Sequence, residues 1–197
     1  MSPDPAAAAA RPPQRFAFAI TGSGHFLEES LALARRLPDA DLLLSAAGEE
    51  VLPMYGHSLD SLKQHFRVVR DKTASAVPVG QIYEEAYHTI VVAPATSNTV
   101  AKIAYGLSDT LPTNMVAQAG KLGIPSIVFA CDTEPVVLTT APKTSNQDWF
   151  TLRPRRIELA NVDRLRTMEF IEVVCDPAQL EAALDRRLDQ LGLAWVA

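Results

Sequence analysis

The sequence lacks a surplus of basic residues and any long apolar run. Its 18 lysines and arginines are outnumbered by 23 aspartates and glutamates, and the formal charge of −5 provides no basic field for a phosphate backbone. No stretch approaches the roughly 18 consecutive apolar residues of a membrane-spanning helix. The first residues, MSPDPAAAAARPPQRF, do not combine a basic start with an apolar core, as a secretory leader would. We therefore expect neither a nucleic-acid partner nor a membrane partner.

Cysteine is also scarce. The two cysteines, Cys131 and Cys175, form no CxxC pair and have no histidine cluster beside them in the sequence. This spacing argues against a zinc site and against a disulfide framework, so no metal ligands are proposed. Two reduced thiols are typical of a cytoplasmic protein, which is the location that we predict.

The composition is that of one globular domain. Hydrophobic residues make up 48% of the 197 residues, which is enough for a sizeable core. We expect a single α/β domain over residues 15–197. Residues 1–14, rich in proline and alanine, are expected to form a mobile tail.

Short apolar runs alternate with helical patterns along the domain. Near-continuous apolar runs are typical of strands buried on both faces, so the pattern predicts an open, doubly wound (Rossmann-like or flavodoxin-like) parallel sheet with helices on both faces. The expected strands are residues 15–21, 41–47, 89–95, 124–132 and 168–176, and the expected helices are 25–37, 98–107 and 177–192. Segments 53–86 and 134–156 show weak periodicity and are expected to be irregular, as functional lids, subunit contacts or mobile loops are.

The loop after the first strand, ITGSGHF, has the features of a phosphate site. Gly22 and Gly24 allow close backbone approach, Ser23 offers a hydroxyl, and a helix N-terminus follows. The third glycine of a dinucleotide fingerprint is replaced by Leu27, and the second strand ends at Ser45 rather than at a ribose-binding carboxylate. The loop therefore favours a mononucleotide over NAD, although a simple strand-to-helix turn would explain it equally well.

A second strand end, VVAPATSNTV, is unusually polar. After Pro94 and Ala95 come Thr96, Ser97, Asn98 and Thr99, just where a helix is expected. One N-cap, Ser97 or Asn98, would satisfy that helix. Four polar side chains in a row indicate a ligand with several polar edges.

Further candidates flank these two loops. Cys131 and Asp132 end another strand and are expected at the rim of the same site, with the thiol more typical of a small buried residue than of a redox centre. His25 is the histidine closest to the phosphate loop, although a first-turn structural role is as plausible. Ring stacking or subunit contacts could involve the aromatic residues Tyr55, Tyr83, Trp149 and Phe150. Arg153, Arg155 and Arg156 could meet a substrate's acidic groups, but a solvated turn is the simpler explanation.

The window PATSNTVAKIAYGLSDT resembles the flavoprotein superfamily that includes the homo-oligomeric flavin-containing cysteine decarboxylases. The resemblance implies FMN, with Ser23, Gly24 and Ser45 near its phosphate and Pro94 to Thr99 near the isoalloxazine and ribityl chain. It also implies a homo-oligomer built from trimers. The family's catalytic histidine is replaced by Gly80, and its motif P-x-M-N-x-x-M-W is missing, so cysteinyl decarboxylation is disfavoured.

The segments VFACDTEP and LRPRRIELANVDRLRTMEFIEVV resemble archaeal-type flavoproteins and bacterial dihydromethanopterin reductases. That resemblance implies an FMN-dependent oxidoreductase that reduces a dihydropterin by hydride transfer from reduced flavin, with NAD(P)H or a ferredoxin-like protein as electron donor. Two alternatives remain: an electron-transfer flavoprotein with a ferredoxin-like partner, and a non-catalytic flavin-binding subunit. The sequence assigns no catalytic residue.

Overall fold

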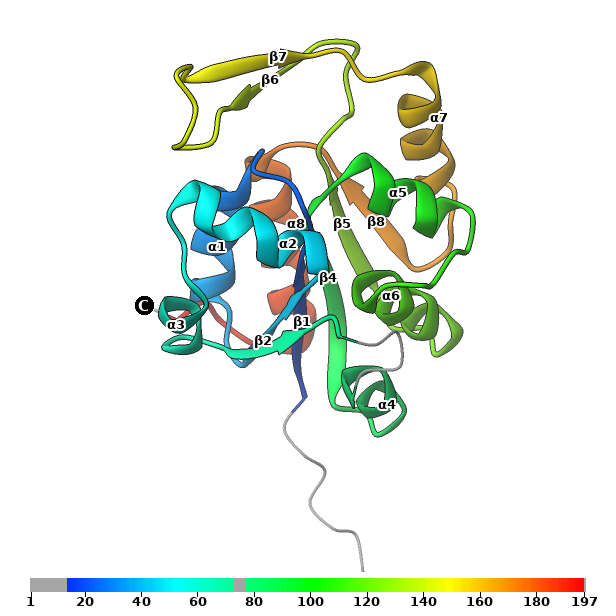
Figure 1. The fold of residues 1–197 in the computed structure, drawn as a ribbon. Helices are drawn as coiled ribbons and strands as arrows, with labels where there is room; N and C mark the ends of the chain where they lie inside the picture. Colours follow the sequence, from blue (N-terminus) through cyan, green and yellow to red (C-terminus); the bar gives the residue numbers. More distant parts are fainter. Residues whose placement is uncertain (1–13, 73–76, 197) are drawn as a thin grey trace, which may run out of the picture.

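A six-stranded parallel sheet forms the centre of the molecule (Figure 1). The computed structural model describes residues 14–72 and 77–196, so the tail expected over residues 1–14 lies almost wholly outside the described part. The strand order is β3-β2-β1-β4-β5-β8, which confirms the predicted doubly wound fold. The strands are β1 (Arg15–Ile20), β2 (Ala40–Leu44), β3 (Arg67–Arg70), β4 (Tyr87–Ala95), β5 (Ser126–Ala130) and β8 (Ile171–Val174).

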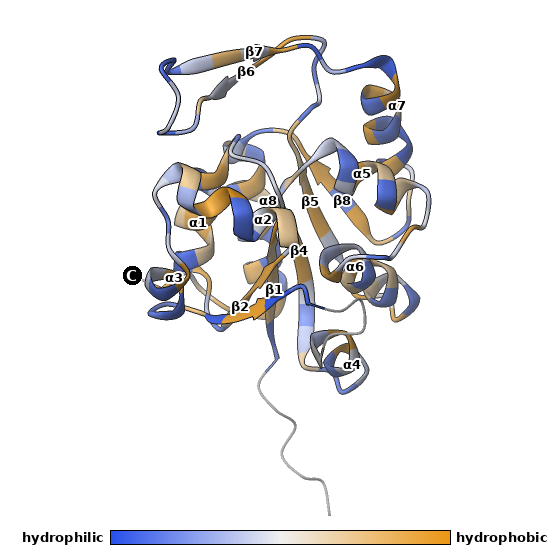
Figure 2. Ribbon diagram, in the orientation of Figure 1, coloured by the Kyte–Doolittle hydropathy of each residue, from blue (hydrophilic) through white to orange (hydrophobic). Residues whose placement is uncertain are grey.

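Helices cover both faces of this sheet. Along β1, Phe16 and Phe18 belong to one hydrophobic cluster and Ala17 and Ala19 to the other, as the two-residue period of a strand requires. The first face carries α1 (Leu27–Arg36), α3 (Leu59–Lys63) and α8 (Pro177–Leu191), and the second carries α4 (Val77–Tyr83), α5 (Ser97–Ala104), α6 (Leu111–Lys121) and α7 (Arg156–Leu165). Hydropathy follows this layering, because the strands are mostly apolar while the helices are polar on their outer sides (Figure 2).

Three sequence expectations need correction. The second strand ends at Leu44 rather than at residue 47, because the Ser45 hydroxyl accepts a hydrogen bond from the Gly48 amide at 2.9 Å and caps α2 (Ala46–Val51). Segment 53–86 is not irregular: its described part contains most of a 3₁₀ helix, η1 (Leu52–Tyr55), and then α3, β3 and α4. Segment 134–156 contains an antiparallel hairpin, β6 (Val137–Thr140) and β7 (Trp149–Leu152).

The C-terminal helix follows its sequence signals closely. Asp176 accepts a hydrogen bond from the Gln179 amide at 2.8 Å, Pro177 occupies the first turn, and Gly192 ends the helix in the left-handed conformation. None of the helices within residues 14–72 and 77–196 is long and apolar enough to cross a bilayer. The same residues hold no group of three or more metal-ligating side chains.

A buried carboxylate ties together the amino-terminal ends of four neighbouring strands. The Asp41 side chain is 3% exposed and accepts hydrogen bonds from Arg15 at 3.2 Å, from the Tyr87 hydroxyl at 2.7 Å, and from Arg67. Burial opposes the charge on Asp41, but the hydrogen bonds from Arg67 and Tyr87 and the charges of both arginines outweigh it and lower the pKa of the carboxyl. The network joins β1, β2, β3 and β4 at the edge opposite the polar loops.

His88 is buried in the same region beside a cation. Its Nδ1 lies 2.8 Å from the Thr89 hydroxyl, its Nε2 has no partner among the described residues, and Arg187 donates to the His88 carbonyl at 2.8 Å. Burial, together with the smaller effect of the Arg187 charge, lowers the pKa of His88 to about 4. In the unfolded chain the pKa of His88 is near 6.5. Between about pH 6.5 and pH 4 the unfolded chain therefore binds a proton at His88 that the folded chain does not bind, and the free energy of unfolding falls as pH drops through this range.

Replacing His88 by glutamine should therefore reduce the loss of folding stability that occurs as pH falls. We expect the free energy of unfolding of His88→Gln, measured by urea denaturation, to decline less steeply than that of the parent protein between about pH 6.5 and pH 4. His65→Gln, which changes an exposed histidine, is the control and should keep the parent slope. Identical slopes for His88→Gln and the parent protein would contradict the assignment.

Candidate functional site

The polar loops meet where the strand order reverses. Strands β1 and β4 are neighbours, and the chain leaves them towards opposite sides of the sheet, which opens a crevice at their carboxyl ends. The loops that follow β1 and β5 come together above β4, because the Cys131 sulfur lies 3.3 Å from the Ser23 hydroxyl. The strand ends that the sequence singled out are therefore adjacent in space.

Thr21, which the sequence interpretation missed, joins the ends of β1 and β4. Its hydroxyl donates to the Pro94 carbonyl at 2.7 Å and accepts from the Thr96 amide at 3.0 Å. The Ala93–Pro94 peptide bond is cis. Strand β4 continues through Pro94 to Ala95 with a register shift, and so ends at the same residue as the expected strand 89–95. The only sequence signal for Thr21 was a threonine at the end of an apolar strand.

The four polar residues at the start of α5 make different contacts. The N-cap is Thr96 rather than Ser97 or Asn98, because the Thr96 hydroxyl accepts from the Thr99 amide at 3.2 Å. The Ser97 hydroxyl donates to the Asp132 carboxylate. Asn98 is exposed. One cap thus accounts for only part of the polar run, and Asn98 stays available to a ligand.

A cavity of about 350 Å³ opens over these loops. Seven of the residues predicted from the sequence line it: Gly22, Ser23, Gly24, His25, Thr96, Cys131 and Asp132. The opposite wall comes from η1 and the segment around the β6–β7 hairpin, through Tyr55, Thr139, Thr140, Pro142, Phe150 and Leu152. The structure therefore brings the three predicted strand ends together and adds a wall that sequence reasoning did not assemble.

The other six predicted residues lie just beneath or beside the cavity. Ser45 is buried as the cap of α2, and Pro94, Ala95 and Thr99 are buried in the strand and the first turn of α5. Ser97 is bonded to Asp132, and Asn98 is the exposed member of the set. In this geometry, four of the six support the floor of the site, while Ser97 fixes one of its charged side chains.

The hairpin roofs the cavity and is tied to η1. Figure 1 shows β6 and β7 above the carboxyl ends of the sheet. The Tyr55 hydroxyl donates to the Thr140 carbonyl at 3.1 Å, and the Lys143 amide donates to the Met54 carbonyl at 2.9 Å. The Tyr55 ring packs directly on Gly24, where a Cβ atom would lie 1.8 Å from the ring. A glycine is required at that position to accommodate the ring.

The aromatic residues proposed from the sequence separate into two groups. Tyr55 and Phe150 line the cavity. Trp149 is 56% exposed, and the Tyr83 hydroxyl donates to Gln118 in α6, away from the site. Of the four candidates, only Tyr55 and Phe150 are placed where they could stack on a ring in the cavity.

Three groups that line the cavity have shifted pKa values: His25, Cys131 and Tyr55, the last raised by burial. Burial lowers the pKa of His25, while the charges of Asp132 and Glu29 act in the opposite direction. Burial raises the pKa of the Cys131 thiol to about 12, and Asp132 adds to that effect. Cys131 therefore stays a protonated thiol at neutral pH, in line with the structural role expected for it.

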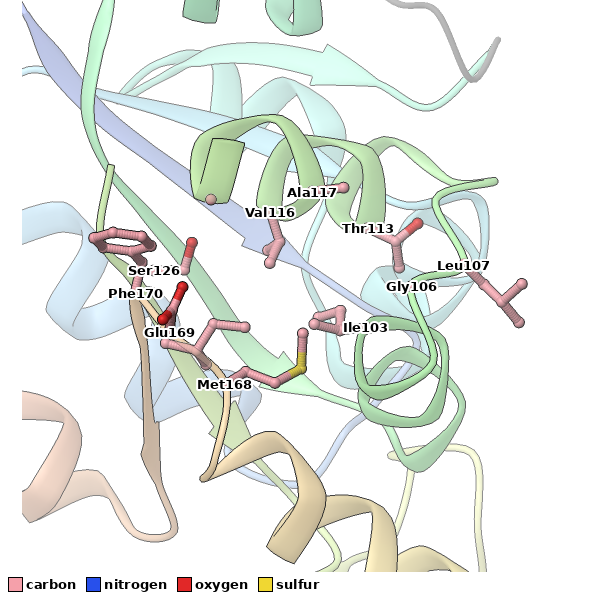
Figure 3. Close-up of a pocket in the computed structure, with 12 residues that line it drawn as sticks. Ile103, Gly106, Leu107, Thr113, Val116, Ala117, Ser126, Met168, Glu169 and Phe170 are labelled. Atoms are coloured by element: carbon pink, nitrogen blue, oxygen red, sulfur yellow. The ribbon is translucent and has the colours of Figure 1, made fainter. Parts of the chain in front are cut away.

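A smaller hollow lies between α5, α6 and the amino-terminal ends of β5 and β8. It measures about 120 Å³ and is lined mainly by apolar side chains, among them Ile103, Val116, Met168 and Phe170 (Figure 3). Among the residues that the structure describes, Glu169 is its single charged lining residue. The larger cavity over the polar loops is therefore the better candidate for chemistry.

Comparison with known proteins agrees with this assignment. A model of the flavoprotein family matches residues 7–191 of the sequence. The chain belongs to the flavoprotein family. Relatives within it include an uncharacterised protein of Methanocaldococcus jannaschii, which is 35% identical over 89% of this chain and 96% of its own length.

Another relative is a dihydromethanopterin reductase (acceptor) of Methanosarcina mazei, which is 38% identical over 66% of this chain. The match spans only 59% of that relative's length.

Solved structures of flavoproteins share the fold. Burkholderia xenovorans DmrB in complex with FMN, described as a cubic protein cage for redox transfer, is 60% identical over 93% of this chain and 99% of its own, with a TM-score of 0.86. A dodecameric FMN-dependent UbiX-like decarboxylase from Escherichia coli is 16% identical over 92% of this chain and 97% of its own, with a TM-score of 0.66, and shows the fold alone.

Proposed function

We propose that this flavoprotein is an FMN-dependent oxidoreductase that reduces a dihydropterin to a tetrahydropterin. The observation that carries the proposal is the 60% identity, over nearly the whole chain, to a protein whose structure contains FMN. The relatives named dihydromethanopterin reductase, at 38% and 34% identity, support the pterin as substrate. Dihydromethanopterin is the dihydropterin that we propose.

The residues at the cavity fit a flavin mononucleotide. Helix α1 begins without a side-chain cap, so its first amide groups can meet an anion beside Ser23, and Gly22 and Gly24 keep that loop free of side chains. Asn98 at the start of α5 offers an exposed amide to a polar ring edge. We propose that the phosphate binds at the Gly22–Gly24 loop and that the ring system lies towards α5.

When bound, FMN supplies hydride transfer, which protein side chains do not provide. The chain then needs to bind, orient and shield the reactants. Tyr55 and Phe150 offer ring surfaces in the cavity wall, and the roof formed by the β6–β7 hairpin limits the access of water.

The remaining partners are also proposals. The electron donor is NAD(P)H or a ferredoxin-like protein, and a cytoplasmic location suits either. The cage described for DmrB supports a homo-oligomer, and light scattering of the purified protein would determine its size. An electron-transfer flavoprotein and a non-catalytic flavin-binding subunit are the rival functions.

Absorption spectroscopy tests the proposal directly. The purified protein should show oxidised-flavin bands that bleach on anaerobic reduction and return when dihydromethanopterin is added. A flavin that becomes reduced but is not reoxidised by dihydromethanopterin would favour the electron-transfer function instead. A protein that stays colourless after incubation with FMN would refute the flavin assignment.

Removing the exposed amide of Asn98 should weaken FMN binding. A hydrogen bond of this kind contributes about 1 kcal/mol, so Asn98→Ala is expected to bind FMN roughly fivefold to tenfold more weakly, as measured by quenching of flavin fluorescence. Asn146→Ala, which changes an exposed asparagine between β6 and β7, is the matched control. Unchanged affinity in Asn98→Ala would show that α5 does not contact the flavin.

A further inference from the structure

Two titratable side chains face the same cavity from different loops. His25 follows β1, Asp132 follows β5, and both line the space of about 350 Å³. The contact of 3.3 Å between the Cys131 sulfur and the Ser23 hydroxyl holds these two loops together. An acid and a base from different loops are thus placed at the proposed flavin site.

The structure fixes the position of each side chain. The Asp132 carboxylate accepts a hydrogen bond from Ser97, so its orientation is set by the first turn of α5. The His25 ring packs on Phe26 with ring centroids 3.6 Å apart, and Phe26 stacks on Phe129 at 4.8 Å. The His25 backbone amide donates to the Ser23 hydroxyl at 3.2 Å. Each side chain is thus held at the cavity by its own contacts, and general acid catalysis requires a positioned donor of this kind.

The two nitrogens of the His25 ring hydrogen-bond no protein group among the described residues. Because these nitrogens form no hydrogen bond within the fold, they are available to bind a ligand in the cavity. In a purely structural histidine, by contrast, a ring nitrogen is normally engaged by a protein neighbour.

The proposed reaction needs a proton at a defined atom. Reduction of a dihydropterin imine adds a hydride from reduced flavin to the carbon of the C=N bond and a proton to its nitrogen. The flavin loses two electrons and becomes oxidised, and the substrate gains one C–H and one N–H bond. Hydride transfer alone would leave a negative charge on the nitrogen.

We propose that His25 donates this proton to the imine nitrogen, and that Asp132, held by Ser97, positions the imidazolium and stabilises its charge. This inference rests on the proposed dihydropterin reductase function. After transfer, His25 is a neutral imidazole and regains its proton from water at the cavity mouth. His25 is the catalytic residue, and Asp132 and Ser97 are positioning residues.

The charges around His25 oppose its burial only in part. Burial lowers the pKa of His25, and although the carboxylates of Asp132 from the β5 loop and Glu29 from α1 favour the charged ring, the pKa stays below its usual value, so the rate of proton donation should rise as pH falls. The other titratable groups lining the cavity are the Cys131 thiol, whose pKa is raised to about 12, and Tyr55, whose pKa burial also raises, so both are neutral near pH 7. Removing the charge of Asp132 should therefore lower the pKa of His25 further.

The test combines a binding, a titration and a kinetic measurement on the FMN-loaded protein. FMN affinity is measured by fluorescence, the His25 pKa by NMR titration of its ring protons, and the reaction by single-turnover reoxidation of reduced flavin with dihydromethanopterin across pH. The variants are His25→Gln, Asp132→Asn and Ser97→Ala. Asp148→Asn, which changes an exposed carboxylate beside β7, is the control.

We expect His25→Gln to slow reoxidation by about 100-fold or more and to lose the pH dependence that His25 imposes. Asp132→Asn should lower the NMR pKa of His25 and shift the alkaline fall in rate to lower pH by the same amount, with a smaller shift in Ser97→Ala. Asp148→Asn should match the parent protein in all three measurements.

The opposite results are distinguishable. If His25→Gln binds FMN and reoxidises with the parent rate and pH profile, the proton-donor role is wrong while the reductase function stands. If Asp132→Asn leaves the His25 pKa unchanged, the positioning role is wrong. If the parent protein binds FMN but its reduced flavin never reacts with dihydromethanopterin, the proposed function fails, and this inference fails with it.

Discussion

Asp41→Asn is expected to lower the free energy of unfolding at pH 7 by about 2–3 kcal/mol. The substitution keeps the shape of the side chain but removes the negative charge that Arg15 and Arg67 share. Both arginines are partly exposed, so water solvates part of the charge that is left, and the loss is smaller than for a fully buried ion pair. Tyr87 also loses the charged acceptor of its hydroxyl.

Urea denaturation with a matched control measures this effect. Asp39→Asn changes an exposed aspartate in the left-handed conformation, which asparagine tolerates, and should change stability by less than about 0.5 kcal/mol. The pKa of Asp41 is lowered in the fold, so its contribution is present above the pKa of the unfolded chain and is lost as pH falls below it. The gap between Asp41→Asn and the parent protein should accordingly narrow in acid. A gap no larger than that of the control at pH 7 would show that the network adds no stability.

Gly48→Ala should disturb both the fold and the site. A Cβ atom at residue 48 would lie 2.6 Å from the Ile20 carbonyl oxygen and 3.1 Å from the Ser45 hydroxyl. The first of these is backbone, which cannot move aside as a flexible side chain can. We expect the free energy of unfolding to fall by about 1–3 kcal/mol, together with a loss of FMN affinity, because the end of β1 leads into the Gly22–Gly24 loop.

The same change at a second glycine separates sterics from helix propensity. Gly120 lies in α6, and a Cβ atom there would meet nothing within 4 Å. Gly120→Ala should therefore raise stability by up to about 1 kcal/mol and leave FMN binding unchanged. Thermal unfolding and flavin fluorescence of the two variants test the contrast. If Gly48→Ala behaved like Gly120→Ala, the close approach of α2 to β1 would have no energetic consequence.

The central strands were predictable because burial on both faces leaves a near-continuous apolar run. This holds for β1, β4 and β5, whose residues are almost all buried. Strand β3 has the opposite character, because Arg67 and Arg70 are exposed at its ends and the two valines between them are only partly covered. An edge strand of four residues has no such run, so the sequence pattern did not separate it from the turns around it.

The site shows the same division between local and distant signals. Glycines after β1 and a polar helix start after β4 are local patterns, and both lead to residues that line the cavity. The roof depends on a contact between Tyr55 and Thr140, which are far apart in the chain, and no local pattern encodes that contact. Thr21 was missed for a related reason, since its partners Pro94 and Thr96 become neighbours only after β1 and β4 pair.

The span of chain that encloses the cavity sets when the site can exist during synthesis. Its lining begins at Gly22 and ends at Leu152, so the first loop emerges from the ribosome long before the roof does. The nascent chain cannot enclose a ligand until β7 has been made and β1 has paired with β4 across the intervening helices. A ligand that needs all these walls therefore binds and stabilises only the completed domain, and leaves partly synthesised chains without that protection.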